Sequence, residues 1–220
     1  ALERLEDFTL AAGADPRKAL PRDEPADDLA AFVRRSMLDA YATADRLAAS
    51  AGGKVGDSRY PQTGLGSRLE LIARLIKVGM GARVLYTTQG SYDTHYSQLF
   101  THANLLAELS GAVKAFLDDL AAAGLAERVV VLCFSEFGRR VRENGSAGTD
   151  HGTAGPVFLA GPGVRAGLVG ATPSLLDLQD GDLKMSLDFR RVYATVLEDW
   201  LGLPARAALA GDFERLPLFR

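Results

Sequence analysis

Hydrophobic residues recur at every third or fourth position in several segments of the chain, and this spacing predicts amphipathic helices. In the first such segment, Asp27 and Asp28 precede the apolar positions, where carboxylates favour the start of a helix. Residues 1–20 are rich in Ala and Leu at helical spacing, whereas Pro, Gly and charged residues predict loops at 21–28 and 52–66. Helices are expected at residues 29–50, 67–78, 103–124 and 187–201.

Shorter apolar runs indicate strands. Residues 129–134 (VVVLCF) and 156–160 (PVFLA) are continuous runs, too short for helices, joined by a polar loop rich in Gly, Ser and Asn. The segment 82–88 (ARVLYTT) predicts a third short strand. From residue 67 onward the expected order is helix, strand, helix, strand, strand, helix, which is typical of an α/β protein with a largely parallel central sheet. We therefore expect one α/β domain over residues 1–220.

Polar residues with possible chemistry follow the ends of these predicted strands. Asp93 and His95 come after the predicted strand at 82–88, and Glu136 comes directly after the one at 129–134. Asp150 and His151 lie in the polar loop that leads to the predicted strand at 156–160. In open α/β sheets, functional groups gather beyond the carboxyl ends of the strands, so these five residues are the candidate site.

The residue types in this set suit a divalent metal ion. Asp93 and His95 are two positions apart, so in an extended segment their side chains point the same way and can converge on one ion. Adjacent Asp150 and His151 point apart unless the loop turns; they then serve two ions, or one binds while the other orients it. Imidazole and carboxylate ligands together fit zinc, manganese, magnesium or calcium.

Structural roles also account for these residue types. Asp and His in loops commonly cap helices and form turns, and His102 fits a helix cap or a surface position. Glu136 can pair with Arg139 or Arg140. The two arginines are alternatively candidates for binding the anionic group of a substrate, because guanidinium matches the geometry of phosphate and sulfate. The sequence has neither a Gly-x-Ser-x-Gly elbow nor a Gly-x-x-x-x-Gly-Lys-Ser/Thr loop, which argues against those hydrolase and nucleotide-binding classes.

Composition excludes several functional classes. The net charge of −3 gives no electrostatic basis for binding nucleic acid or an anionic membrane. No apolar run approaches the roughly 20 residues of a membrane-spanning helix, so no span is expected. The single cysteine, Cys133, excludes a disulfide framework and is expected to be a buried core thiol.

Three separated segments carry a recognisable pattern. They read GSYDTHYSQ at 90–98, FSEFGRRVRENGSAGTDHGTAGPVFLAGPGVRAGLVG at 134–170 and DGDLKMSLDFRRVYATVLEDWLG at 180–202. In this order they resemble the DUF1501 family, a bacterial group of largely uncharacterised proteins, over residues 80–202. That family is similar in outline to the alkaline phosphatase and sulfatase superfamily. The resemblance implies an alkaline-phosphatase-like fold, with a largely parallel central sheet flanked by helices.

The resemblance also implies roles for individual residues. Members of the superfamily carry an Asp and a His after one strand, an acidic metal ligand at the end of a later strand, and a further His in the next loop. By that pattern Asp93, His95, Glu136 and His151 are metal ligands, and Asp150 is an additional ligand or a group that orients one.

Two departures from the superfamily pattern matter. Phe137 stands where the phosphatases carry a histidine, which removes one imidazole from a second ion. No strand followed by a nucleophile precedes Asp93. The chain also starts at ALERLEDF without an initiator Met. We therefore expect residues 1–220 to be the C-terminal part of a longer alkaline-phosphatase-like domain, or a protein that lacks the covalent step.

The expected function is that of a metal-dependent hydrolase acting on a small anionic ester of phosphate or sulfate. The alternative is a non-catalytic metal-binding or ligand-binding domain of the same fold, and a plain protein-interaction module is the third reading. Many members of the resembled family carry twin-arginine export signals, which implies a periplasmic or exported protein.

Overall fold

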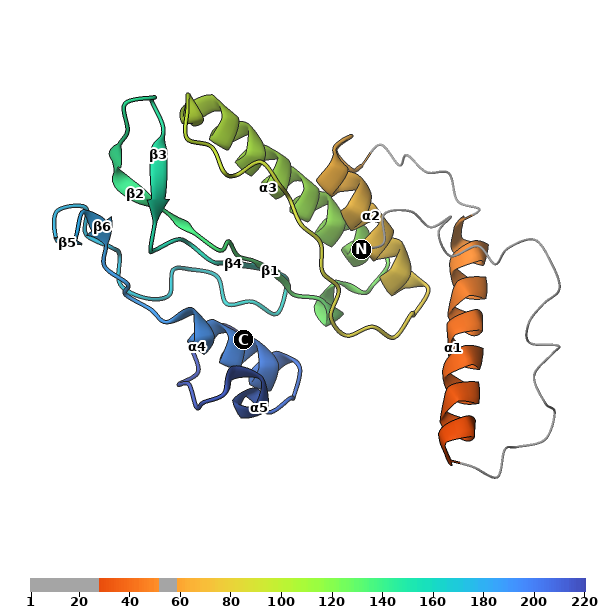
Figure 1. Ribbon diagram of the computed structural model, residues 1–220. Helices are drawn as coiled ribbons and strands as arrows, with labels where there is room; N and C mark the ends of the chain where they lie inside the picture. Colours follow the sequence, from red (N-terminus) through yellow and green to blue (C-terminus); the bar gives the residue numbers. More distant parts are fainter. Residues whose placement is uncertain (1–27, 52–58) are drawn as a thin grey trace. The chain divides into compact units, whose positions relative to one another are not determined.

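A computed structural model describes residues 28–51 and 59–220 (Figure 1). The chain divides into two compact units, Ala1–Thr87 and Thr88–Arg220, which are treated separately below. The predictions for residues 1–20, for the loop before Asp28 and for residues 52–58 lie outside the described residues. The expectation of a single domain over the whole chain stays a prediction.

The first unit contains two described helices, α1 (Asp28–Ala51) and α2 (Gly64–Lys77), both where apolar spacing predicts them. Thr63 caps α2, because its hydroxyl accepts a hydrogen bond from the Gly66 amide at 3.2 Å. The buried side of α2 follows the expected periodicity and includes Leu65, Leu69, Ala73 and Leu75.

The predicted strand at 82–88 is wrong. This segment pairs with no described strand. Its side chains alternate between exposed and half-buried positions over residues 84–88. Arg68 on α2 donates to the Thr87 hydroxyl at 3.0 Å, which ties the end of the segment to the helix by a side chain. Alternation alone therefore identified extended backbone but not a pairing partner.

The second unit begins with the irregular segment that precedes α3 (Gln98–Ala122). This helix starts five positions earlier than its apolar spacing predicts and ends just before Gly124, whose positive φ of 70° suits glycine. Its buried residues lie in the second half of the helix and include Ala112, Phe116 and Leu120. The first half is more exposed, and its first residues lie beside the hairpin tip that borders the candidate site.

All the strands described in this unit belong to two-stranded antiparallel sheets (Figure 1). In the first sheet, Val131 pairs with Ala160 and Cys133 with Phe158, so the two apolar runs do form strands. The pairs are β1 (Val131–Cys133) with β4 (Phe158–Ala160), β2 (Gly138–Glu143) with β3 (Thr149–Gly152), and β5 (Leu178–Gln179) with β6 (Asp182–Leu183).

The expectation of an alkaline-phosphatase-like fold with a largely parallel central sheet is therefore wrong. A parallel pair needs a crossover connection, which is usually a helix. Between β1 and β4 the chain instead forms the β2–β3 hairpin, which turns it back so that β4 runs antiparallel to β1. The class is mixed α and β, with helices and small antiparallel sheets.

The core of the second unit packs the β1–β4 sheet against the C-terminal part of the chain. Val192, Leu216 and Leu218 are buried there, and Leu132 and Leu159 from the two strands pack on them. Val192 belongs to α4 (Phe189–Thr195), which continues into a π-helical turn (Val196–Trp200) and is followed by α5 (Ala205–Leu209). The predicted helix at 187–201 is thus confirmed, with a changed hydrogen-bond pattern in its last turn.

Two further features bear on the expected function. Cys133 is half-buried rather than fully buried, and burial raises the pKa of its thiol. Over the ranges that the structure describes, no helix combines the length and the apolar character that crossing a bilayer requires.

Candidate metal centre

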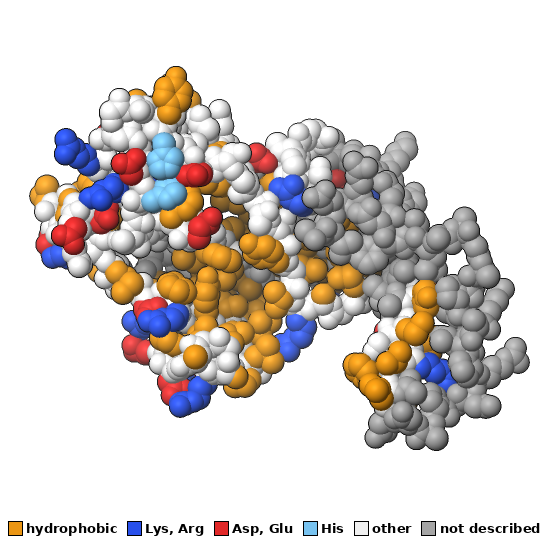
Figure 2. Space-filling view, in the orientation of Figure 1, with side chains coloured by type: hydrophobic (Ala, Val, Ile, Leu, Met, Phe, Trp, Pro, Cys, Tyr) orange, Lys and Arg blue, Asp and Glu red, His pale blue; other side chains and the backbone are white. Residues whose placement is uncertain are grey.

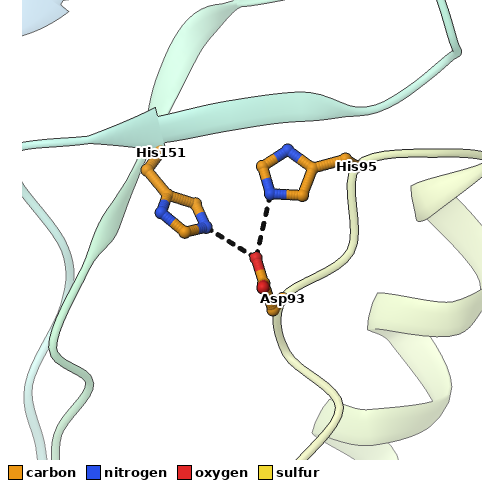
Figure 3. A group of neighbouring side chains, drawn as sticks. All are labelled: Asp93, His95 and His151. Carbon is orange, nitrogen blue, oxygen red and sulfur yellow. Dashed lines mark hydrogen bonds and ion pairs between the residues drawn. The ribbon is translucent and has the colours of Figure 1, made fainter.

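Three side chains from two separate parts of the second unit converge on one point (Figure 3). Oδ1 of Asp93 lies 2.9 Å from Nε2 of His95 and 2.7 Å from Nε2 of His151. The two imidazole rings are 4.9 Å apart between centroids. The sequence predicts that His95 and His151 meet with Glu136 at one site; the structure brings the two histidines together, but the group that forms does not include Glu136.

The backbone around Asp93 explains why the first two side chains meet. The Thr94 amide donates to the Tyr92 carbonyl at 2.8 Å, a three-residue turn with Asp93 at its centre. Asp93 and His95 therefore approach each other across a turn, and not along a straight extended strand as the sequence spacing indicates.

His151 reaches the site from the β2–β3 hairpin, whose tip bonds to the start of α3 (Figure 1). The amides of Ser97 and Gln98 donate to the carbonyls of Ser146 and Ala147 at 3.0 and 2.9 Å. Amides at a helix start have no partner within the helix, so the hairpin satisfies them. Gly148 is required here, because a Cβ at that position would lie 2.5 Å from the carbonyl carbon and oxygen of His95.

The imidazole of His151 bonds to Asp93 through Nε2 and is also packed against an aromatic ring on its face. The Phe137 ring stacks on it, with centroids 3.9 Å apart and planes 11° apart. The guanidinium carbon of Arg139 lies 5.1 Å from the centre of the Phe137 ring. Phe137, which the sequence marks only as a departure from the phosphatase pattern, thus fixes the plane of a candidate ligand.

The two arginines predicted to bind an anionic substrate group are engaged with the main chain. Arg139 donates to the Thr149 carbonyl at 2.6 Å and also to the Tyr92 carbonyl, so it joins the hairpin to the segment before α3. Arg140 donates to the Asp180 carbonyl at 2.6 Å. The structure gives both guanidinium groups a bracing contact, and their role with a substrate stays a prediction.

Asp150 lies on the other side of His95 from the convergence point. Its Oδ1 is 3.4 Å from Nδ1 of His95, whereas Asp93 faces Nε2 of the same ring. One carboxylate therefore stands at each ring nitrogen. This arrangement favours the reading in which Asp150 orients the ligand, because a carboxylate on Nδ1 leaves Nε2 to bind an ion.

Glu136 and His102 are not brought into this cluster. Among the described residues, the group whose ligand atoms all lie within 4.8 Å of one another consists of Asp93, His95 and His151. Glu136 is exposed in the turn after β1. His102 meets the Tyr92 ring edge-on at 5.7 Å, and its Nδ1 is buried without a hydrogen-bond partner in the part of the chain described.

The donor set fits a single divalent ion with mixed nitrogen and oxygen ligands. Zinc binds His nitrogen and carboxylate oxygen at about 2.0–2.2 Å, so tetrahedral geometry places its ligand atoms about 3.3–3.6 Å apart. The separations of 2.7 and 2.9 Å around Oδ1 of Asp93 are hydrogen-bond distances, so small side-chain rotations must widen them before an ion fits. Calcium and magnesium prefer oxygen ligands, so two imidazoles favour zinc, manganese or a similar transition metal.

Hydrogen bonding keeps the carboxylates of the cluster ionised. Bonds from His151 and then His95 lower the pKa of Asp93. Bonds from Asn144 and then His95 lower the pKa of Asp150. At neutral pH Asp93 is therefore in the charged form that can bind a metal ion, and Asp150 is in the charged form that can orient His95.

The cluster is open to solvent. The side chain of Asp93 is 69% exposed and those of both histidines are 44% exposed. In the space-filling view, pale-blue histidine side chains lie at the surface with red acidic side chains beside them (Figure 2). Three protein ligands on an open surface leave coordination positions for water or another molecule.

Sequence reasoning missed Asn144, whose side chain bonds to both His95 and Asp150. A partial signal was present, because Asn144-Gly145 is a common turn dipeptide in hairpins. A two-residue turn there would have predicted a hairpin with Arg139 opposite Asp150, whereas the structure closes the hairpin through the loop 144–148 and pairs Arg139 with His151.

Comparison with known proteins identifies one family. The family model described as "Protein of unknown function (DUF1501)" matches residues 30–210, a longer stretch than the three motifs cover. No curated protein and no solved structure matches the chain.

Proposed function

Because the chain belongs to the DUF1501 family, whose description assigns no activity, we propose a function from the site itself: Asp93, His95 and His151 bind one divalent metal ion and the protein hydrolyses a small phosphate or sulfate ester there. The convergence of two imidazoles and a carboxylate from separate parts of the second unit carries this proposal. Metal binding by these three residues does not require an alkaline-phosphatase-like fold, because the ligand geometry comes from the turn at Asp93 and the β2–β3 hairpin.

The chain supplies the ligand environment that a hydrolytic ion needs. Such an ion, when bound, polarises an ester oxygen and lowers the pKa of a coordinated water. Asp93 is kept ionised, Asp150 faces the second nitrogen of His95, and Phe137 holds the plane of His151. These contacts limit the freedom of each ligand before an ion arrives, which lowers the entropy lost on binding.

The arrangement supports one ion and not two. Asp93 faces both histidines through the same oxygen, Oδ1. Asp150 is on the opposite side of His95, and Glu136 is outside the cluster. An anionic substrate is expected because the ion adds positive charge to an exposed site, and the choice of phosphate or sulfate rests on the family resemblance.

The test compares turnover with metal content. The full chain is loaded with zinc or manganese and assayed on panels of aryl phosphates and aryl sulfates, alongside His151→Ala and the matched control His102→Ala. We expect turnover that follows bound metal, is lost in His151→Ala and is kept in His102→Ala. Stoichiometric metal with no turnover on either panel would remove the catalytic claim and leave the binding claim.

The exposure of the cluster favours a second candidate, a non-catalytic metal-binding domain. Hydrolytic sites usually exclude bulk water, whereas the Asp93 side chain is 69% exposed. In that case zinc raises the melting temperature of the protein, His151→Ala abolishes the rise, and neither ester panel is turned over.

A further inference from the structure

One asparagine at the tip of the β2–β3 hairpin uses all four hydrogen-bonding positions of its side-chain amide. Nδ2 of Asn144 donates to the His95 carbonyl at 3.0 Å and to Oδ1 of Asp150 at 3.1 Å. Its Oδ1 accepts from the amides of Ser146 at 2.9 Å and Gly148 at 3.2 Å. An amide has two donor hydrogens and two acceptor lone pairs, so this side chain is saturated.

We propose that Asn144 is a positioning residue for the metal site: its Nδ2 holds the His95 main chain and the Asp150 carboxylate together, so that Nε2 of His95 is aimed at the ion. This inference rests on the proposed metal site and adds a residue that does not touch the ion. The donor end of the amide faces the site, while the acceptor end closes the turn.

The two bonds from Nδ2 act on the same ligand from different directions. One fixes the main chain of His95, and the other fixes Asp150, which faces Nδ1 of the His95 ring at 3.4 Å. An imidazole whose Nδ1–H is bonded to a carboxylate presents an unprotonated Nε2, which is the form that binds a metal.

The chemistry of the two ends allows them to be tested apart. Aspartate at position 144 keeps oxygen acceptors for the amides of Ser146 and Gly148, so the turn is preserved. It loses both donor hydrogens and adds a second negative charge beside Asp150. Alanine at the same position loses both ends and weakens the turn as well.

The decisive experiment measures zinc affinity by calorimetry for the full chain and a set of variants. Asn144→Asp is expected to bind zinc at least about 10-fold more weakly, in the range for loss of an outer-sphere partner. The double variant Asn144→Asp/Asp150→Asn is expected to recover part of that loss, because it restores the contact between positions 144 and 150 but leaves the His95 carbonyl without its donor. The amide then sits at position 150, donates to the carboxylate at position 144, and still offers an oxygen to Nδ1 of His95.

A purely structural role makes a different prediction. It lowers the melting temperature of the metal-free protein and gives no recovery of affinity in the double variant. Asp150→Ala, which leaves the turn contacts of Asn144 intact, is the second route to the same test and is expected to weaken zinc binding to a similar extent.

Each outcome has one meaning. Wild-type protein that binds no zinc overturns the metal site and the inference with it. Wild-type binding with unchanged affinity in Asn144→Asp or in Asp150→Ala overturns only the positioning role. Weakened binding in both single variants with recovery in the double variant supports it.

Discussion

The cluster of Asp93, His95 and His151 and the apolar core of the second unit are held together by different forces. Around Val192, Leu216 and Leu218 the side chains are buried and pack on the β1–β4 sheet. Around Asp93 the side chains are exposed, and side-chain hydrogen bonds to backbone carbonyls and amides fix the geometry. Apolar packing therefore accounts for most of the stability of the unit, whereas the polar contacts set the orientation of the three side chains in the cluster.

The largest expected effect is in the core. Leu216→Ala removes a nearly buried side chain and should lower the free energy of unfolding by about 2–5 kcal/mol. Urea denaturation followed by circular dichroism measures this. The matched control is Leu176→Ala, a leucine that is 96% exposed, with an expected change of about 0.5 kcal/mol or less. An equal loss in both variants would contradict the division between core and surface.

The next effect is specific to the cluster. Asp93→Asn removes the charge that faces both histidines and should weaken zinc binding by about 100-fold or more, because one of three ligands loses its charge. The denaturation midpoint of the metal-free protein at neutral pH should fall only slightly, since this side chain is exposed and its hydrogen bonds stabilise the fold weakly. A large loss of metal-free stability with normal zinc affinity would show instead that Asp93 stabilises the fold and does not bind the ion.

Gly148→Ala should lower both the free energy of unfolding and the affinity for zinc. A Cβ there would lie 2.5 Å from the His95 carbonyl, so either the hairpin tip or the His95 main chain must shift. We expect a loss of about 1–3 kcal/mol in unfolding free energy, the usual cost of forcing extra volume into a close contact, together with weaker zinc binding. Gly145→Ala, where an added Cβ meets nothing within 4 Å, is the control.

The smallest effect concerns acid. The pKa of Asp93 is lowered from its ordinary value of 3.8, so the ionised form stabilises the folded state above that pH. This contribution is lost as the pH falls from 3.8 toward the lower folded value. The acid-unfolding midpoint of metal-free Asp93→Asn should therefore lie slightly above that of wild type. No change, or a shift to lower pH, would contradict the assignment of those hydrogen bonds.

The helices were the most predictable part of the fold. Apolar residues at three- and four-residue spacing located α2 and α3 because packing against a core imposes that period. The two strands at 131–133 and 158–160 were also found, but their direction was not. Direction depends on the connection between them, and the hairpin that the loop 144–148 closes was interpreted only as a polar loop.

The site was predictable as a set of residue types but not as a geometry. Asp93, His95 and His151 were identified from their positions near strand ends, and they do converge. Their convergence depends on a turn centred on Asp93 and on the hairpin docking at α3, neither of which leaves a periodic signal. Glu136 was included for the same positional reason, yet the turn after β1 leaves it outside the cluster.

The contact between the hairpin tip and the start of α3 makes two main-chain amides natural reporters. Ser97 and Gln98 donate to carbonyls of the tip, so their hydrogens can exchange with deuterium only when the tip lifts away. Exchange at these two positions would count the openings of the site directly. A bound ion that bridges Asp93 and His151 would slow both amides together, without any change elsewhere in α3.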